Sequence, residues 1–190
     1  AGEPGLSVII PYPEEEIEIE TVIRSVINQY FFPILSGDLV VTIAGGANEQ
    51  ALDKQSLFTY IDGTDWQDRK ALNRRLEFAK WCLSQPDDAF VRLTEPPEGR
   101  APKWEEALFN PAQLQHLRSR FEAGEKLAFY MPLWVEPRKK DIEHSHFKFF
   151  LERDALIDRG EDYFIRDGIT VSGVSSQRQK GMRVIVSVAD

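Results

Sequence analysis

The C-terminal stretch over residues 147–189 constrains the fold most strongly, because it holds three candidate strands in close succession. They cover residues 147–152, residues 163–166 continued by 169–171, and residues 182–188. Each is rich in aromatic and β-branched residues, which favour strands, and glycines lie in the gaps between them. This pattern predicts an antiparallel sheet.

Length and charge exclude several classes of protein. A chain of 190 residues with 42% apolar residues can bury a substantial core. No apolar run approaches the roughly 20 residues of a transmembrane helix, and the N-terminus lacks a signal-peptide pattern. We therefore expect a cytoplasmic protein that does not associate with membranes. The net charge of −8, with an acidic run before Arg24, argues against a nucleic-acid-binding domain.

Upstream of residue 147, strand and helix patterns alternate. Strands are predicted over 6–12, 39–43, 89–93 and 127–135, and helices over 14–30, 64–85, 104–109 and 111–122. The first helix is expected to end within 31–35, and a simple turn is expected at 44–48. Pro132 confines its strand to an edge or an irregular position, because proline lacks the N–H that a ladder needs. The predicted fold class is α+β, a mixed, largely antiparallel sheet with flanking helices.

Residues 95–102 are rich in proline, which predicts a connector rather than a helix or a central strand. We expect a single α+β domain over 1–190, and the alternative is two subdomains, 1–95 and 103–190, joined by this connector. The chain begins without Met and ends directly after a predicted strand. We therefore expect it to be part of a longer protein.

Two further features have a plain structural interpretation. Cys82 lies in a helical apolar pattern, so we expect a small core residue rather than a catalytic thiol. The arginines and lysines of the helix over 64–85 are expected to form a solvated face with intrahelical ion pairs. His116 is expected on a helix surface.

His144 and His146 alternate, so a strand would place both on one face, a spacing that can bind zinc. The apolar alternate residues of the strand would then face the core and leave both histidines and Lys148 on a solvated face. No third His or Cys is suitably placed in the sequence. No complete catalytic site can be identified from the residues alone.

Residues 5–11, Gly-Leu-Ser-Val-Ile-Ile-Pro, resemble the closing strand of a GHKL (Bergerat-type) ATPase domain. In that family a glycine after the ATP lid leads into an alternating strand that often ends in proline. The order of the following elements, up to the strand around Arg166-Asp167-Gly168, resembles the region after the nucleotide domain in Hsp90, gyrase B and MutL relatives. More closely, it resembles the C-terminal part of uncharacterised bacterial ATP-binding proteins of the Hsp90-like type.

The resemblance implies a transducer-like region, in part with a ribosomal-S5-domain-2-like fold. In that family the transducer often lends a basic residue to the γ-phosphate of ATP in the neighbouring domain, where positive charge stabilises the phosphate. Gln177, Arg178 and Lys180 resemble such a Gln-x-Lys loop, with Gly181 allowing close backbone approach. Arg166 is a second candidate. The alternative is a polar hairpin loop whose charges serve solubility.

The acidic helix that holds Mg-ATP in that family and its glycine-rich lid are absent from this sequence. The chain alone is therefore expected to hold no cofactor and to catalyse no reaction. ATP and Mg²⁺ would belong to an adjacent ATP-binding domain of the same protein, and a homodimer is compatible with the resemblance. The alternatives are a protein-interaction module that uses the glutamate-rich helix expected over 14–30 and exposed aromatic residues, and a metal-dependent hydrolase built on His144 and His146.

Overall fold

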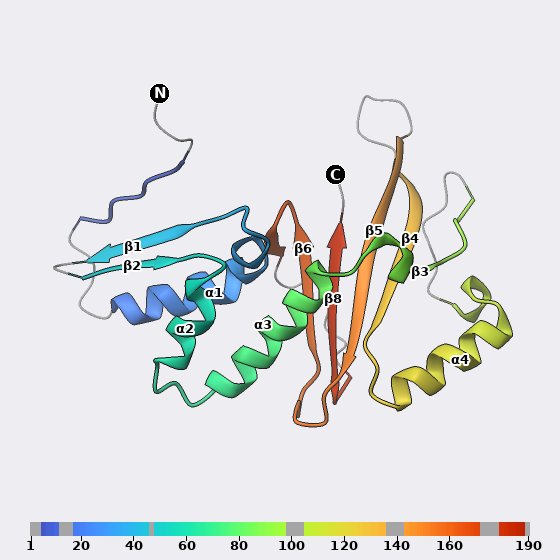
Figure 1. Ribbon diagram of the computed structural model, residues 1–190. Coiled ribbons are helices and arrows are strands. Elements are labelled where there is room, and N and C mark those ends of the chain that lie inside the picture. Colours follow the sequence, from blue (N-terminus) through green and yellow to red (C-terminus); the bar gives the residue numbers. More distant parts are fainter. Residues whose placement is uncertain are drawn as a thin grey trace.

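The computed structural model describes residues 5–11, 17–45, 48–97, 105–135, 143–171 and 179–188. Within these ranges the chain forms a six-stranded sheet, a two-stranded sheet and four α-helices (Figure 1). The prediction of an α+β fold with a mixed, largely antiparallel sheet and flanking helices is confirmed.

The six-stranded sheet contains the three C-terminal strands expected from the sequence. Its order is β3 (Val91–Arg92), β4 (Leu127–Val135), β5 (Glu143–Arg153), β8 (Met182–Val188), β6 (Glu161–Arg166) and β7 (Ile169–Val171). The β3–β4 and β6–β8 pairs are parallel, and the other neighbours are antiparallel.

Pro132 lies where β4 can tolerate it. The short strand β3 pairs with β4 only at residues 129 and 130, and Pro132 faces His146 of β5 on the other side. Beyond residue 130, no second strand among the described residues pairs with β4, and the missing N–H of Pro132 disrupts no ladder with β3. This confirms the edge position expected for the strand.

Different helices pack on the two faces of the sheet at β5. Phe149 of β5 belongs to a small apolar cluster with Leu117 of α4 (Pro111–Glu122). Phe150, the next residue, points to the opposite face and joins a larger cluster with α1 (Ile19–Ser36) and α3 (Arg69–Leu83). The expectation that β5 has one core face and one solvated face is therefore wrong along its C-terminal half.

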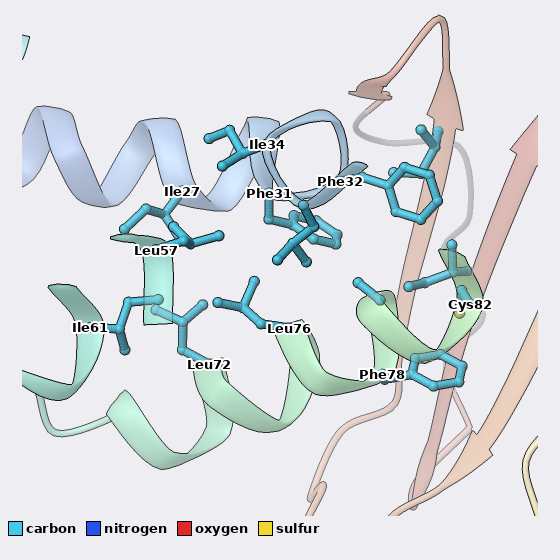
Figure 2. Packing of buried hydrophobic residues seen from close by; sticks show 14 of the residues in the cluster. Ile27, Phe31, Phe32, Ile34, Leu57, Ile61, Leu72, Leu76, Phe78 and Cys82 are labelled. Atoms are coloured by element: carbon cyan, nitrogen blue, oxygen red, sulfur yellow. The ribbon is translucent and has the colours of Figure 1, made fainter. Parts of the chain in front are cut away.

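The larger cluster fills the space between α1, α2 (Ser56–Asp62) and α3, and continues onto the sheet (Figure 2). Ile27, Leu57 and Leu76, one from each helix, are 0% exposed. The cluster also contains Ile185 of β8. Residues that precede and residues that follow the proline-rich connector in the sequence therefore share one apolar core. The division into two subdomains stays a prediction.

Helix α1 continues through Pro33, although the sequence analysis placed its end in this segment. A proline inside a helix costs about 3 kcal/mol. Phe31, Ile34 and Leu35 of the same turn are nevertheless buried, and each buried side chain of this size contributes about 1.5–3 kcal/mol. Burial therefore outweighs the proline penalty. The helix ends at Gly37, whose φ of 92° permits a left-handed cap that bonds the carbonyls of Pro33 and Ile34.

The N-terminal region differs most from the prediction. The described residues 5–11 form no strand, so the strand expected over 6–12 is wrong there. Strand β1 (Val41–Gly45) pairs with β2 (Asn48–Leu52), a strand that was not predicted, and residues 46–47 of the expected turn lie outside the described part. Helix α2 was also missed. The helix expected over 14–30 begins at Ile19, and residues 12–16 lie outside the described part.

Among the described residues, no helix combines the length and the apolar character needed to cross a membrane.

We expect Leu76→Ala to lower the free energy of unfolding by about 2–5 kcal/mol, because it empties part of a fully buried site. Urea denaturation measures this change. Leu156→Ala removes the same atoms from a side chain that is 71% exposed, and should change stability by no more than about 0.5 kcal/mol. Equal losses in the two variants would contradict the assigned core.

Candidate functional site

The residues expected to contact phosphate do not lie together. Lys180 precedes β8, whereas Arg166 is the last residue of β6. The two strands are parallel, with Glu161 opposite Arg183 and Arg166 opposite Val188. At about 3.3 Å per residue, Lys180 and Arg166 are therefore separated by more than about 17 Å along the strands. One phosphate group could not contact both. Gln177 and Arg178 lie outside the described residues.

Lys180 lies on a turn whose backbone is held closely. The amide of Asp154 donates to the carbonyl of Gly181 at 3.0 Å, and the amide of Gly181 donates to the carbonyl of Ile157 at 3.0 Å. A Cβ at Gly160 would lie 2.1 Å from the carbonyl oxygen of Gln179, so only glycine fits there. Gly181 has a φ of 73°, which also favours glycine. The turn is therefore fixed on both sides of Lys180.

The ammonium group of Lys180 remains in solvent. Its side chain is 74% exposed, and its nitrogen lies 3.7 Å from an Oδ1 of Asp158, which is 98% exposed. An ion pair between two such exposed groups contributes little, because water and salt screen it. Lys180 therefore presents a positive charge from a rigid point at this end of the sheet.

Arg166 has a different setting at the opposite end. Asp167 and Gly168, which follow it, have φ values of 52° and 75° and form the tight turn between β6 and β7. The Asp-Gly pair is thus explained by hairpin geometry, since both positions need positive φ. The Arg166 side chain is 68% exposed, and its Nε lies 3.9 Å from Asp167.

Beneath the Lys180 turn lies a buried ionic network that the sequence analysis missed. Arg183 of β8 is 0% exposed and donates to Glu161 at 2.8 Å and to Glu152. Its second terminal nitrogen lies 3.8 Å from Asp154. The sequence did contain a signal for this network. Arg183 is a charged residue between the apolar Met182 and Val184, and on a strand it points to the face opposite these two.

Helix α3 takes part in the same network. Arg74 donates from Nε to Asp154 at 2.9 Å, and the Arg75 guanidinium lies 4.9 Å from the ring centre of Tyr163. These two arginines face the sheet, so the expected solvated face of the helix is wrong for them. Tyr163 in turn donates its hydroxyl to Glu161 at 3.0 Å. The network therefore joins α3 to strands β5, β6 and β8.

Two pKa shifts reflect this burial. Desolvation raises the pKa of the Tyr163 phenol, and the positive charge of Arg75 opposes this effect. For Arg183, desolvation alone would lower the pKa, but the hydrogen bonds and charges of Glu161 and Glu152 outweigh it and raise the pKa. The tyrosine is therefore neutral and the arginine charged over the ordinary pH range.

The remaining candidates have structural surroundings. Cys82 is buried in the larger cluster, as expected for a core residue, and burial raises the pKa of its thiol. A thiol of this kind is a poor nucleophile, because the thiolate is the reactive form. His116 is exposed on α4, as expected.

His144 and His146 point to the same face of β5, as the alternation predicted. The ring of His144 contacts Trp134 and bonds to Glu95, and the ring of His146 stacks on Tyr130. In the described ranges, no three His, Cys, Asp or Glu side chains lie close enough to hold a metal ion. The described residues supply no third ligand for the zinc hypothesis.

No protein-family model, no curated protein and no solved structure matches this chain. Its function must therefore be argued from its own residues.

We expect Arg183→Leu to lower the free energy of unfolding by about 3–5 kcal/mol, because it removes the buried cation to which both Glu152 and Glu161 are paired. Thermal or urea denaturation measures the loss. Arg159→Leu, at an exposed position, serves as the matched control and should be close to neutral. A loss as small as that of the control would show that the network does not hold the sheet and α3 together.

Proposed function

We propose that this chain is a non-catalytic coupling or scaffold region of a larger GHKL-type ATP-dependent protein. In this proposal Lys180 contacts a phosphate group of ATP that is bound in a neighbouring domain. The observation that supports it is the position of Lys180, an exposed charge on a turn whose backbone is fixed by hydrogen bonds and by Gly160. A fixed backbone reduces the entropy cost of holding a cation against a phosphate.

The turn also has a route to the helical layer. The backbone of Asp154 bonds to Gly181, and the side chain of Asp154 accepts from Arg74 of α3. A force on Lys180 that moved the turn would act on this aspartate, and through it on the interface between α3 and the sheet. In this proposal the presence of phosphate at Lys180 is coupled to the position of α3, because loss of the phosphate would remove the force on the turn.

The proposed partner is an adjacent ATP-binding domain of the same bacterial, cytoplasmic protein. ATP and Mg²⁺ would be bound there and not by this chain. A homodimer would allow Lys180 to reach the domain of the second copy instead. Because Arg166 lies at the far end of β6, it would serve another contact. Gln177 and Arg178 adjoin the turn in sequence and belong to the same proposed loop.

Lys180→Ala in the full-length protein should slow ATP hydrolysis by about tenfold or more, because one charge-assisted contact to phosphate is lost. Steady-state ATPase assays measure this. Lys70→Ala, which removes an exposed lysine from α3, is the matched control and should leave turnover unchanged. The isolated chain should show no ATP binding by calorimetry. Unchanged turnover in the Lys180 variant would refute the role assigned to this residue.

A second candidate, a protein-interaction module without a nucleotide role, is favoured by a different observation. Leu6, Val8, Ile9 and Ile10 lie in the described N-terminal segment and are between 61% and 90% exposed. Adjacent apolar side chains with this exposure are typical of contact surfaces.

If the chain is an interaction module, Leu6→Ser and Ile9→Ser should each abolish capture of its partner in a pull-down. Lys180→Ala should leave that capture unchanged, because the lysine lies in another part of the fold. Circular dichroism confirms that the variants stay folded. Capture that survives both serine substitutions but depends on Lys180 would exclude this candidate.

A further inference from the structure

Arg92, Tyr130 and Lys148 form a row of exposed or partly buried side chains across β3, β4 and β5, on the face of the sheet that carries the larger cluster. Arg92 of β3 lies opposite Tyr130 of β4, and Tyr130 lies opposite Lys148 of β5. The preceding row, which contains Ala128 and Phe150, is buried in the core. The row with Arg92 is therefore the first one beyond the core, and it places two cations on either side of a tyrosine.

The aromatic rings hold these cations in place. The Arg92 guanidinium lies 4.5 Å from the ring centre of Tyr130, and the Lys148 ammonium lies 4.7 Å from that of Phe90. The ring of His146, in the next row of β5, stacks on Tyr130 at 4.5 Å with an angle of 22° between the planes. Because β3 and β5 flank β4, Arg92 and His146 contact Tyr130 from opposite sides. Such contacts reduce side-chain freedom at little cost in solvation.

Positive charge is poorly compensated at this place. Lys148 lies 3.8 Å from Asp87, but the Asp87 side chain is 86% exposed and the pair is therefore weak. Arg92 has no carboxylate within ion-pair distance among the residues that the structure describes. Glu95 lies near the end of β5 and is paired with His144, two rows away from Lys148. The patch thus stands out in a chain with a net charge of −8.

The titration of His146 agrees with this geometry. Partial burial lowers its pKa from the ordinary value of 6.5, and the charges of Lys148 and Arg92 lower it further, while Asp87 acts in the opposite direction. These are the charged groups that face the ring from β5, β3 and the turn η1 (Asp87–Ala89). An anion placed here would remove the unfavourable field and allow the imidazole to take up a proton.

We propose that Arg92, His146 and Lys148 form a binding site for the phosphate group of a small molecule. Arg92 and Lys148 start two strands apart, about 10 Å between their backbones. His146 lies on β5 with Lys148, in the next row, and its ring stacks on Tyr130 of the strand between them. Arginine offers paired N–H donors that match two phosphate oxygens, whereas lysine and protonated histidine each add one donor. Two cations and a histidine that takes up a proton on binding suit a phosphate dianion better than a carboxylate, which carries a single charge.

A small phosphate compound fits better than a nucleic acid. A polymer would bring many phosphates close to a chain of net charge −8, and this repels polyanions. Tyr130 is also contacted by Arg92 and His146, so its ring offers no open face on which a base could stack. The ligand is therefore either free phosphate or a mononucleotide, which share the same phosphate group.

This site is independent of the role proposed for Lys180. Lys148 lies opposite Ser187 near the C-terminal end of β8, whereas Lys180 precedes the start of that strand. The two lie at opposite ends of the sheet. Failure of one proposal therefore leaves the other unaffected.

The test is an NMR titration of the histidine rings in the whole chain with inorganic phosphate at constant ionic strength. We expect saturable shifts of His146, a rise in its pKa on binding, and little change at His144, which Glu95 already holds. Arg92→Gln and Lys148→Gln should each weaken binding by about tenfold, the effect of losing one charge-assisted contact. Lys70→Ala, which removes an exposed lysine from α3, should bind phosphate as the unchanged chain does.

Two further arms identify the source of the phosphate. Tighter binding of AMP than of inorganic phosphate would assign a mononucleotide, and equal or weaker binding would assign free phosphate. The proposal is overturned if chloride at the same ionic strength produces the same shifts, or if Arg92→Gln and Lys148→Gln do not weaken binding. It is equally overturned if a single-stranded oligonucleotide binds at this patch while inorganic phosphate and AMP do not.

Discussion

The buried charge of Arg183 is the interaction on which the arrangement of the sheet and α3 depends. A guanidinium at 0% exposure is stable only when carboxylates surround it, because burial of an unpaired charge costs several kcal/mol. Glu152 and Glu161 supply the partners from the strands on either side of β8, and Asp154 lies at 3.8 Å. The positions of three strands are therefore coupled to one side chain.

The same network explains why the two ends of the sheet differ. At the end near Arg183, Asp154 ties the backbone of Gly181 to Arg74 of α3, and the chain is held closely by hydrogen bonds. At the other end lies the row that contains Tyr130 and Lys148, whose side chains are only partly buried. An exposed cation on a hydrogen-bonded turn therefore lies at one end, and a solvent-accessible group of cations and aromatic rings lies at the other.

Sequence patterns predicted the fold where burial imposed a regular period, and failed where it did not. The strand 127–135 and the helix 111–122 match β4 and α4 in their bounds. The strand β2 was missed because its residues Asn-Glu-Gln-Ala-Leu have little preference for strands, and α2 because 7 residues are too few to establish a helical period. Residues 5–11 have a strand pattern, but in the described structure they pair with no strand.

The candidate sites were harder to predict than the fold, because they depend on pairing between distant segments. Arg92 and Tyr130 are neighbours only because β3 pairs with β4 in parallel, and no local pattern indicates that register. The sequence did indicate that His146 and Lys148 share a face. It could not indicate that Arg92 joins them, nor that Lys180 and Arg166 point from opposite ends of the sheet. A site formed by side chains from three strands can be identified only when the order and register of those strands are known.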